Sequence, residues 1–190
     1  MSTEDQSKYT DLETYEMGAL LNSINDLDQS VANAVQNAIP QIECFCSNTL
    51  LKMKNGGRLF YVGSGTSGRL GIVDASECPP TYGVPQGLVV GIIAGGDPAI
   101  RVAVENAEDD PLQGWYDLQE HSISKSDFVL GISASGGAPY ILGALEQCKA
   151  NGVSCGAIAC NTNSEIGKMA DHKISTFGMI EVIKFGIIAQ

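Results

Sequence analysis

Four near-continuous apolar runs in the chain constrain its fold most strongly. They begin near residues 58, 88, 127 and 153, and read RLFYVG, LVVGIIAGG, DFVLGISAS and VSCGAIAC. Strands that are apolar on both faces are typical of a parallel sheet covered by helices on both sides. Segments that can form helices separate and follow the runs, at 67–76, 97–107 continuing toward 120, 138–150 and 163–170. The sequence therefore predicts an α/β, doubly wound fold with a mostly parallel sheet.

A helical pattern precedes the first run. Apolar residues recur at a spacing of roughly 3.6 residues from Asp11 to about Lys54, and Pro40 predicts a kink or a restart. The sequence NGG at 55–57 predicts the end of this helix, because glycine readily forms the left-handed cap. We expect an N-terminal helical arm over residues 1–54 and a separate sheet domain over residues 55–190.

Composition excludes several classes of function. A net charge of −11 argues against nucleic acid or an anionic membrane as a partner, and no apolar run is long enough to span a bilayer. The start, MSTEDQSKYT, lacks the features of a signal peptide, so we expect a cytoplasmic protein. The six cysteines are then expected to be reduced thiols. Their spacing, together with only two histidines, predicts no metal site.

The loop after the first apolar run, GSGTSGR, matches part of two nucleotide-binding motifs. Gly63, Gly65 and Gly68 fit the dinucleotide pattern, but the acid expected about 20 residues later is missing, since none lies between Glu77 and Asp97. The P-loop pattern requires lysine and a hydroxyl residue directly after its last glycine, where this chain has arginine and leucine. Both nucleotide interpretations are therefore disfavoured.

A phosphate monoester fits this loop better. Glycines let the backbone approach an anion, and the N-terminus of a helix starting near Ser67 attracts negative charge. Hydroxyl groups occur in this loop and after the third run, in GISASGGAP; the candidate phosphate-binding residues are Ser64, Thr66, Ser67, Ser133 and Ser135. The alternative is that both loops are tight turns with serine as a helix cap. Two such loops at adjacent strand ends favour one phosphate held from two sides.

Two acidic segments could supply proton transfer. In DASECPPTYG, Asp74 and Glu77 precede a Cys-Pro-Pro sequence that predicts a rigid turn. In AVENAEDD, Glu105 and Glu108 are expected at the end of a helix, where a solvated acidic helix end is the alternative. Two carboxylates near one phosphate site would suit proton abstraction beside a carbonyl and protonation of a leaving group. The residues alone do not distinguish Glu105 from Glu108.

Several motifs together resemble one family. GGRLFYVGSGTSGRLGIVDASECPPTYGV, GLVVGIIAGG, AVENAEDD, GISASG and PYILGALE occur in order and are similar to the N-acetylmuramic acid 6-phosphate etherases of the sugar isomerase (SIS) domain superfamily. The resemblance runs from about Leu12 to Asp171, and DASECPP is its most specific part. It implies that residues 55–190 form a SIS domain that binds a sugar phosphate.

The resemblance also implies a reaction. The family's enzymes are cofactor-free lyases, usually homodimers, that cleave the ether between the phosphorylated sugar and D-lactate during the recycling of cell-wall material. The ring-opened sugar loses the proton beside its aldehyde, expels lactate, and adds water to give N-acetylglucosamine 6-phosphate. By matching motifs, Glu77 is the implied acid and Glu108 the implied base.

The chain departs from the family pattern at two places. Gly137 and Ala138 follow SASG-like residues where the family usually has Arg-Thr or Thr-Thr, which predicts a lost substrate contact. After ADHKI, the chain offers only STFGMIEVIKFGIIAQ in place of a strand, a Gly-Ser-Thr-Arg-Met-Lys-Ala-Gly loop and a long helical portion. It is therefore expected to be shortened. A non-catalytic regulatory module that binds a sugar phosphate is the alternative function.

Overall fold

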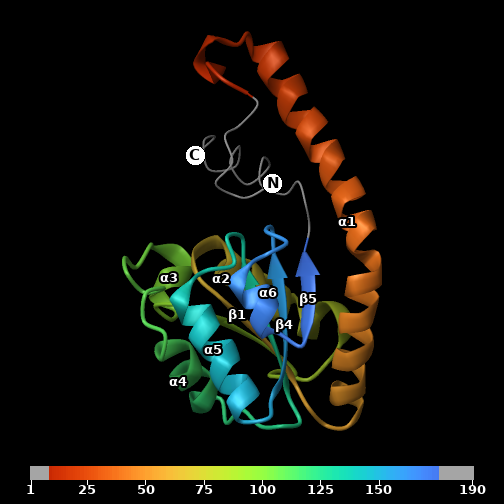
Figure 1. Cartoon of the computed structure of the whole chain (residues 1–190), viewed down its shortest axis with the longest axis vertical. Coiled ribbons are helices and arrows are strands. Elements are labelled where there is room, and N and C mark those ends of the chain that lie inside the picture. Colours follow the sequence, from red (N-terminus) through yellow and green to blue (C-terminus); the bar gives the residue numbers. More distant parts are fainter. Residues whose placement is uncertain (1–8, 176–190) are drawn as a thin grey trace.

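The computed structural model describes residues 9–175 and shows a five-stranded parallel sheet (Figure 1). The strands lie in the order β2-β1-β3-β4-β5, and their bounds are β1 Leu59–Gly63, β2 Val89–Ile93, β3 Phe128–Ser133, β4 Ser154–Ala159 and β5 His172–Ser175. The four apolar runs form β1 to β4, so the predicted α/β class is confirmed. The sequence HKIS of β5 contains one buried apolar residue, Ile174, and was not predicted as a strand.

Helices cover both faces of the sheet. On one face, α1 and α2 lie against Leu59, Tyr61 and Leu130, while α4, α5 and α6 cover Phe60 and Val62 on the other. Their bounds are η1 Leu12–Thr14, α1 Met17–Lys54, α2 Gly65–Tyr82, α3 Pro98–Arg101, α4 Gln113–Glu120, α5 Pro139–Ala150 and α6 Glu165–Met169. Because successive residues of a strand point to opposite faces, this two-sided burial explains the unbroken apolar runs.

Most of the N-terminal arm, Met17–Lys54, is one continuous helix. Helix α1 contains 38 residues, which corresponds to about 57 Å, and it extends well beyond the sheet in Figure 1. The predicted restart at Pro40 is wrong, since the helix runs through this residue. Phe45 anchors the lower part of α1 by an edge-to-face contact with Phe128, at 5.4 Å between ring centroids. The division into an arm and a domain stays a prediction. Within residues 9–175, no helix combines the length and hydrophobicity needed to cross a bilayer.

The predicted helix from 97 to 107 and onward is wrong. Only Pro98–Arg101 and Gln113–Glu120 are helical, and the chain between them turns irregularly. Val102 is extended, and Asn106 adopts a left-handed conformation with φ of 60°. The acidic segment therefore forms a turn between α3 and α4, where it follows the end of β2.

The carboxyl ends of the central strands meet at one edge of the sheet. Gly63, at the end of β1, pairs with Ile93 of β2 on one side and with Ile132 of β3 on the other. The loops that follow these three strands are therefore neighbours. In parallel α/β sheets, ligands collect at this edge, so the candidate site lies here.

An ion pair between half-buried Arg58 and buried Asp127 joins the amino ends of β1 and β3. The Asp127 carboxylate, next to β3, accepts three hydrogen bonds from Arg58 and two from Ser124. Arg58 also donates to the carbonyl oxygens of His121 and Ser122. Burial alone would raise the pKa of the Asp127 carboxyl, but the hydrogen bonds from Arg58 and Ser124 outweigh burial and lower this pKa.

Asp127→Ala is expected to lower the free energy of unfolding by about 3 kcal/mol near neutral pH, since it leaves Arg58 without its carboxylate. Because the folded-state pKa is depressed, this contribution is present above the unfolded-state pKa of about 4 and is lost as the pH falls through the folded-state value. Urea denaturation at neutral and acidic pH measures the difference. Replacement of the exposed Glu146 on α5 by alanine is the control. If the difference in free energy of unfolding between the parent and Asp127→Ala did not shrink in acid, the stabilising role of the ionised Asp127 would be contradicted.

Candidate active site

Close packing between β1 and α2 shapes the first loop. A Cβ atom added to Gly63 would lie 2.6 Å from the backbone nitrogen of Gly68, and one added to Gly68 would lie 2.8 Å from the carbonyl oxygen of Gly63. Both glycines are therefore needed for the strand to enter the helix so directly. The helix begins at Gly65, two residues earlier than the sequence predicted, and its first amide groups face the end of the sheet.

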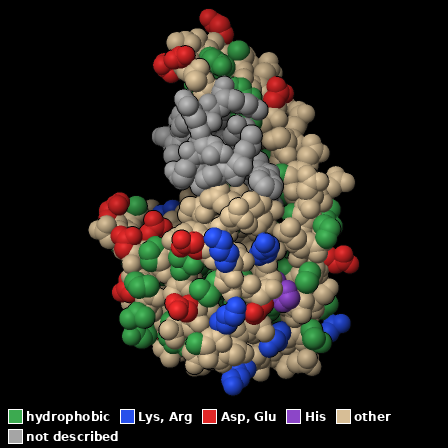
Figure 2. Space-filling view, in the orientation of Figure 1, with side chains coloured by type: hydrophobic (Ala, Val, Ile, Leu, Met, Phe, Trp, Pro, Cys, Tyr) green, Lys and Arg blue, Asp and Glu red, His purple; other side chains and the backbone are tan. Residues whose placement is uncertain are grey.

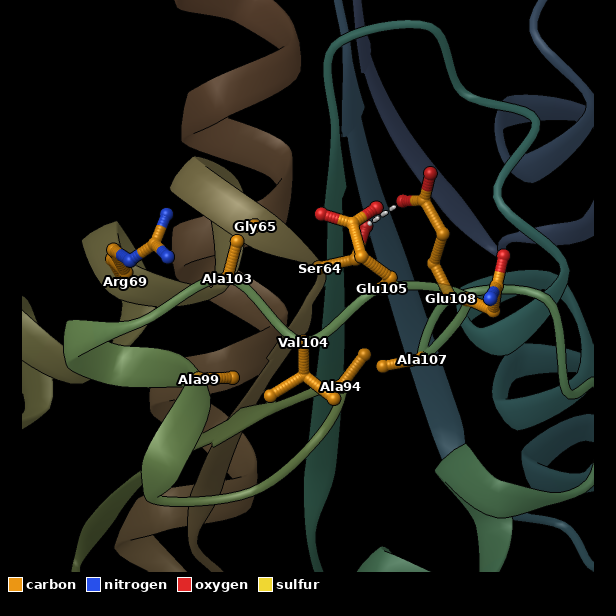
Figure 3. A pocket seen from close by; sticks show the side chains of 11 residues that line it. Ser64, Gly65, Arg69, Ala94, Ala99, Ala103, Val104, Glu105, Ala107 and Glu108 are labelled. Carbon is orange, nitrogen blue, oxygen red and sulfur yellow. Dashed lines mark hydrogen bonds between the residues drawn. The ribbon is translucent and has the colours of Figure 1, made fainter.

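Ser64 contacts Glu108 across the strand ends. The Ser64 hydroxyl donates a 2.6 Å hydrogen bond to Oε2 of Glu108 (Figure 3). Ser64 occupies the N-cap position of α2, yet its side chain makes no capping hydrogen bond. The alternative in which this serine serves only as a helix cap is therefore wrong. The short bond to a carboxylate is of the charge-assisted kind, which fixes the position of the Glu108 side chain.

The turn that carries Glu108 is itself held in place. The backbone N–H of Tyr140, in the first turn of α5, donates to the Glu108 carbonyl oxygen at 2.9 Å. The left-handed Asn106 sets the direction of the chain just before it. Glu105 lies in the same turn, but its carboxylate accepts no hydrogen bond from any residue of the described chain, 9–175. The structure thus separates two glutamates that the sequence could not.

A cavity of about 210 Å³ lies between the first loop and the segment from 94 to 108 (Figure 3). Its lining combines a small apolar wall with five polar or charged side chains; the residues are Ser64, Gly65, Arg69, Ala94, Ala99, Ala103, Val104, Glu105, Asn106, Ala107 and Glu108. The carboxylates of Glu105 and Glu108 both border the cavity. A proton acceptor and a bound small molecule could therefore meet at this place.

The second serine-rich loop lies beside the first but does not line this cavity. Ser133, buried at the end of β3, accepts a 2.9 Å hydrogen bond from the Gly136 amide, and the exposed Ser135 lies 3.5 Å from it, hydroxyl to hydroxyl. The Ser133 hydroxyl thus supports a tight turn, as the alternative interpretation proposed. Thr66 is exposed and Ser67 is half-buried at the start of α2, and both also lie outside the cavity lining.

Glu77 lies far along α2 from this cavity. It is exposed, it is not among the lining residues, and its Oε2 accepts a 3.4 Å hydrogen bond from Thr81. Twelve residues of helix, or about 18 Å, separate it from Gly65 at the start of α2. The structure therefore does not bring Glu77 and Glu108 of one chain together.

The predicted rigid Cys-Pro-Pro turn is wrong. Pro79 and Pro80 lie inside the last turns of α2, which ends at Tyr82 before a left-handed Gly83. The Gly83 amide donates to the Pro79 carbonyl at 2.9 Å, and the Cys78 thiol lies 3.3 Å from the Asp74 carbonyl oxygen. Each proline lacks the N–H that would bond to the carbonyl four residues earlier, and the helix ends within three residues of Pro79.

Asp74 and Cys78 have structural partners. The Tyr61 hydroxyl of β1 donates to Asp74 Oδ2 at 2.7 Å, and burial together with this bond raises the pKa of Tyr61 above its ordinary value. Burial, and secondarily the charge of Asp74, also raises the pKa of the Cys78 thiol. A thiol kept protonated is a poor nucleophile. The bond between Tyr61 and Asp74 therefore fastens α2 to the sheet.

A family model described as the glucokinase regulatory protein N-terminal SIS domain matches residues 41–149. The chain belongs to this family of SIS domains. A second model, described as the SIS domain, matches residues 116–190. Among solved structures, a phosphoheptose isomerase from Francisella tularensis is 21% identical over 89% of this chain and 94% of its own, with a TM-score of 0.66. At this identity the likeness concerns the SIS fold.

Curated relatives confirm the resemblance that the motifs indicated. An N-acetylmuramic acid 6-phosphate etherase from Bacteroides fragilis is 51% identical over 169 residues, which are 89% of this chain and 60% of the relative. The etherase from Christiangramia forsetii is 48% identical over 90% of this chain and 63% of its own length. The SIS chain thus spans about three-fifths of the relatives it matches. Residues 176–190, which make up most of the segment that departs from the family pattern after ADHKI, lie outside the described residues.

Proposed function

We propose that this SIS chain carries the catalytic site of a lyase that acts on N-acetylmuramic acid 6-phosphate. The products are N-acetylglucosamine 6-phosphate and D-lactate, and the reaction needs no cofactor. The hydrogen bond between Ser64 and Glu108 carries the proposal, since it fixes a carboxylate beside a cavity at the ligand-binding edge. The identity of about half of the residues to the etherases supports the choice of reaction.

Glu108 is proposed as the base. In the ring-opened sugar, its carboxylate takes the proton from the carbon beside the aldehyde, and the electron pair forms a double bond to the next carbon as the ether bond breaks. Ser64 holds the carboxylate in one position, because its hydroxyl donates a hydrogen bond to it. Water then adds to the double bond, which restores a hydroxyl where lactate was attached.

The phosphate is proposed to bind at the adjoining strand ends. The start of α2, with Thr66 and Ser67, supplies free amide groups and hydroxyls, and Ser133 and Ser135 approach from the end of β3. The Ser64 hydroxyl donates a hydrogen bond to Glu108. This hydroxyl would have to reorient to donate to a phosphate oxygen. This arrangement places an anion beside a helix N-terminus, which stabilises it without a bound metal.

Glu77 is proposed as the acid that protonates the departing lactate oxygen. Proton removal and loss of lactate occur at neighbouring carbons, so both glutamates must reach one small region of the sugar. Within one chain, about 18 Å of helix α2 separates Glu77 from the loop that contacts Glu108. We therefore propose a homodimer in which Glu77 of one copy completes the site that contains Glu108 of the other.

The exposed surface of α2 is consistent with such a dimer. Leu70, Val73 and Tyr82 are large apolar side chains that are 58%, 58% and 76% exposed on this helix. They flank Glu77 along the sequence, and a second copy covering them would bring Glu77 to its own surface. The cytoplasmic location stays a prediction from the sequence.

A regulatory module that binds a sugar phosphate without cleaving it is the second candidate. The family model that matches 41–149 describes a domain of a regulatory protein, and the chain spans about three-fifths of the etherases. Gly137 contributes no side chain at the end of the serine-rich loop, although a Cβ atom there would meet no neighbour within 4 Å. The structure therefore has space for a larger side chain at position 137, such as those that the family usually has there.

Release of D-lactate distinguishes the two candidates. The purified SIS chain is incubated with N-acetylmuramic acid 6-phosphate, D-lactate is assayed enzymatically, and binding is followed in parallel by calorimetry. Lactate release that saturates with substrate is the expected result. Binding without lactate would favour the regulatory module, whereas neither binding nor release would contradict both.

A further inference from the structure

Arg69 brings a positive charge to the cavity beside Glu108. It is the one cation among the eleven described residues that line the cavity, and two carboxylates line it too. Further exposed acidic residues, Asp97, Asp109 and Asp110, lie in or directly after the segment from 94 to 108, and Figure 2 shows red side chains gathered around α3. An anion entering here would need Arg69 as its partner.

Within the described residues, one of the three guanidinium nitrogens of Arg69 makes a hydrogen bond. Its Nε donates a 3.0 Å hydrogen bond to the carbonyl oxygen of Ile100, just before the end of α3. Its two terminal nitrogens, Nη1 and Nη2, make no hydrogen bond with any other residue in the described part of the chain. The planar end of the guanidinium therefore keeps two donors side by side, a geometry that matches the two oxygens of a carboxylate.

The remaining wall of the cavity is apolar and made of small side chains. Ala94, Ala99, Val104 and Ala107 form this wall, and Ala94 and Ala99 are almost fully buried (Figure 3). The cavity has room for about seven water molecules. A short, branched carboxylic acid has the matching features, because its carboxylate needs a cation and its methyl group needs an apolar wall.

We propose that this cavity binds the D-lactyl arm of the substrate, with Arg69 gripping its carboxylate and the alanines and Val104 receiving its methyl group. This inference rests on the proposed function, since it names which part of the sugar lies beside Glu108. The phosphate does not need Arg69, because the amide groups and hydroxyls at the starts of α2 and of the serine-rich loop can hold it. Arg69 thus selects muramic acid phosphates over phosphorylated sugars that lack a lactyl group.

Two ligands separate this role from phosphate binding. Calorimetry compares N-acetylmuramic acid 6-phosphate with N-acetylglucosamine 6-phosphate, which carries the phosphate but no lactyl group. All chains carry Glu108→Gln, so that the ether stays intact during titration. Adding Arg69→Met is expected to weaken binding of the first ligand at least about tenfold, since a two-point ionic hydrogen bond is lost. Binding of the second ligand should stay within about threefold, because its phosphate contacts are unaffected.

Two further variants sharpen the result. Arg101→Met removes an exposed charge at the end of α3, outside the cavity lining, and should leave binding of both ligands nearly unchanged. Arg69→Lys keeps the charge but not the planar pair of donors, so its affinity for the lactyl-bearing ligand should lie between those of the parent and Arg69→Met. Retained binding of N-acetylglucosamine 6-phosphate also reports that each variant is folded.

The possible failures are distinguishable. Equal weakening of both ligands by Arg69→Met would assign Arg69 to the phosphate and overturn the inference, while leaving the proposed function standing. Unchanged binding of both ligands would overturn it as well, because Arg69 would then touch neither. If the parent chain bound neither sugar phosphate, the proposed function itself would fall, and this inference with it.

Discussion

Glu108→Gln is expected to slow D-lactate release at least about a hundredfold, because a positioned general base contributes roughly that much or more. Glutamine keeps the size of the side chain and can still accept the hydrogen bond from Ser64, but it cannot take a proton. Initial rates with saturating N-acetylmuramic acid 6-phosphate measure the effect. Affinity for N-acetylglucosamine 6-phosphate should change little, since the phosphate contacts remain.

Glu105→Gln is the matched control, with the same chemical change three residues earlier in the same cavity. Glu105→Gln is expected to slow D-lactate release by less than about tenfold, because no hydrogen bond from the described residues positions the Glu105 carboxylate. A larger loss from Glu105→Gln than from Glu108→Gln would identify Glu105, and not Glu108, as the base.

Glu77→Gln is expected to cause a second large loss, of at least about a hundredfold, because the departing lactate oxygen would lack its proton donor. Asp74→Asn is the control on the same helix, one turn earlier and with the same change of charge. Asp74 accepts from Tyr61, so its variant should lose stability more than rate. Rate measurements paired with thermal denaturation separate the two effects, and an active Glu77→Gln variant would remove this residue from the mechanism.

The strands were predictable because their environment leaves a strong pattern. Strands β1 and β3 are buried on both faces. Phe60 packs in the core on one face of the sheet and Leu59 in the core on the other, so the apolar run is continuous. Strand β5 has only four residues, and Ile174 is its one buried residue. Its sequence therefore carries little strand signal.

The helix errors have local causes. The Cys-Pro-Pro sequence predicts a turn, but Pro79 and Pro80 lie in the last turns of α2, and Gly83 terminates the helix. In the opposite direction, the segment around Glu105 has good helix formers, yet Val102 and Asn106 adopt conformations outside the right-handed helix. Tertiary contacts, including the bond from Tyr140 to the Glu108 carbonyl, hold that turn. The helix propensity of the residues in this segment does not reflect these tertiary contacts.

The site was predictable in its parts more than in its assembly. The serine-rich loops and the acidic segment were recognisable, because glycine, hydroxyl and carboxylate groups clustered after strands. The bond between Ser64 and Glu108 joins residues 44 positions apart, and only the order of β1 and β2 in the sheet brings them together. The cavity wall of alanines and the free end of Arg69 follow from the same packing, so neither had a sequence signal.

Mixing two inactive variants tests the central claim that one site uses Glu108 of one copy and Glu77 of the other. Chains carrying Glu77→Gln and chains carrying Glu108→Gln are purified separately, combined, unfolded together and refolded, and D-lactate release is measured. In a shared site, half of the dimers are mixed and one of their two sites is intact, so activity should return to about a quarter of the wild-type value. Activity that stays at the level of the separate variants, although mass spectrometry detects mixed dimers, would contradict the claim.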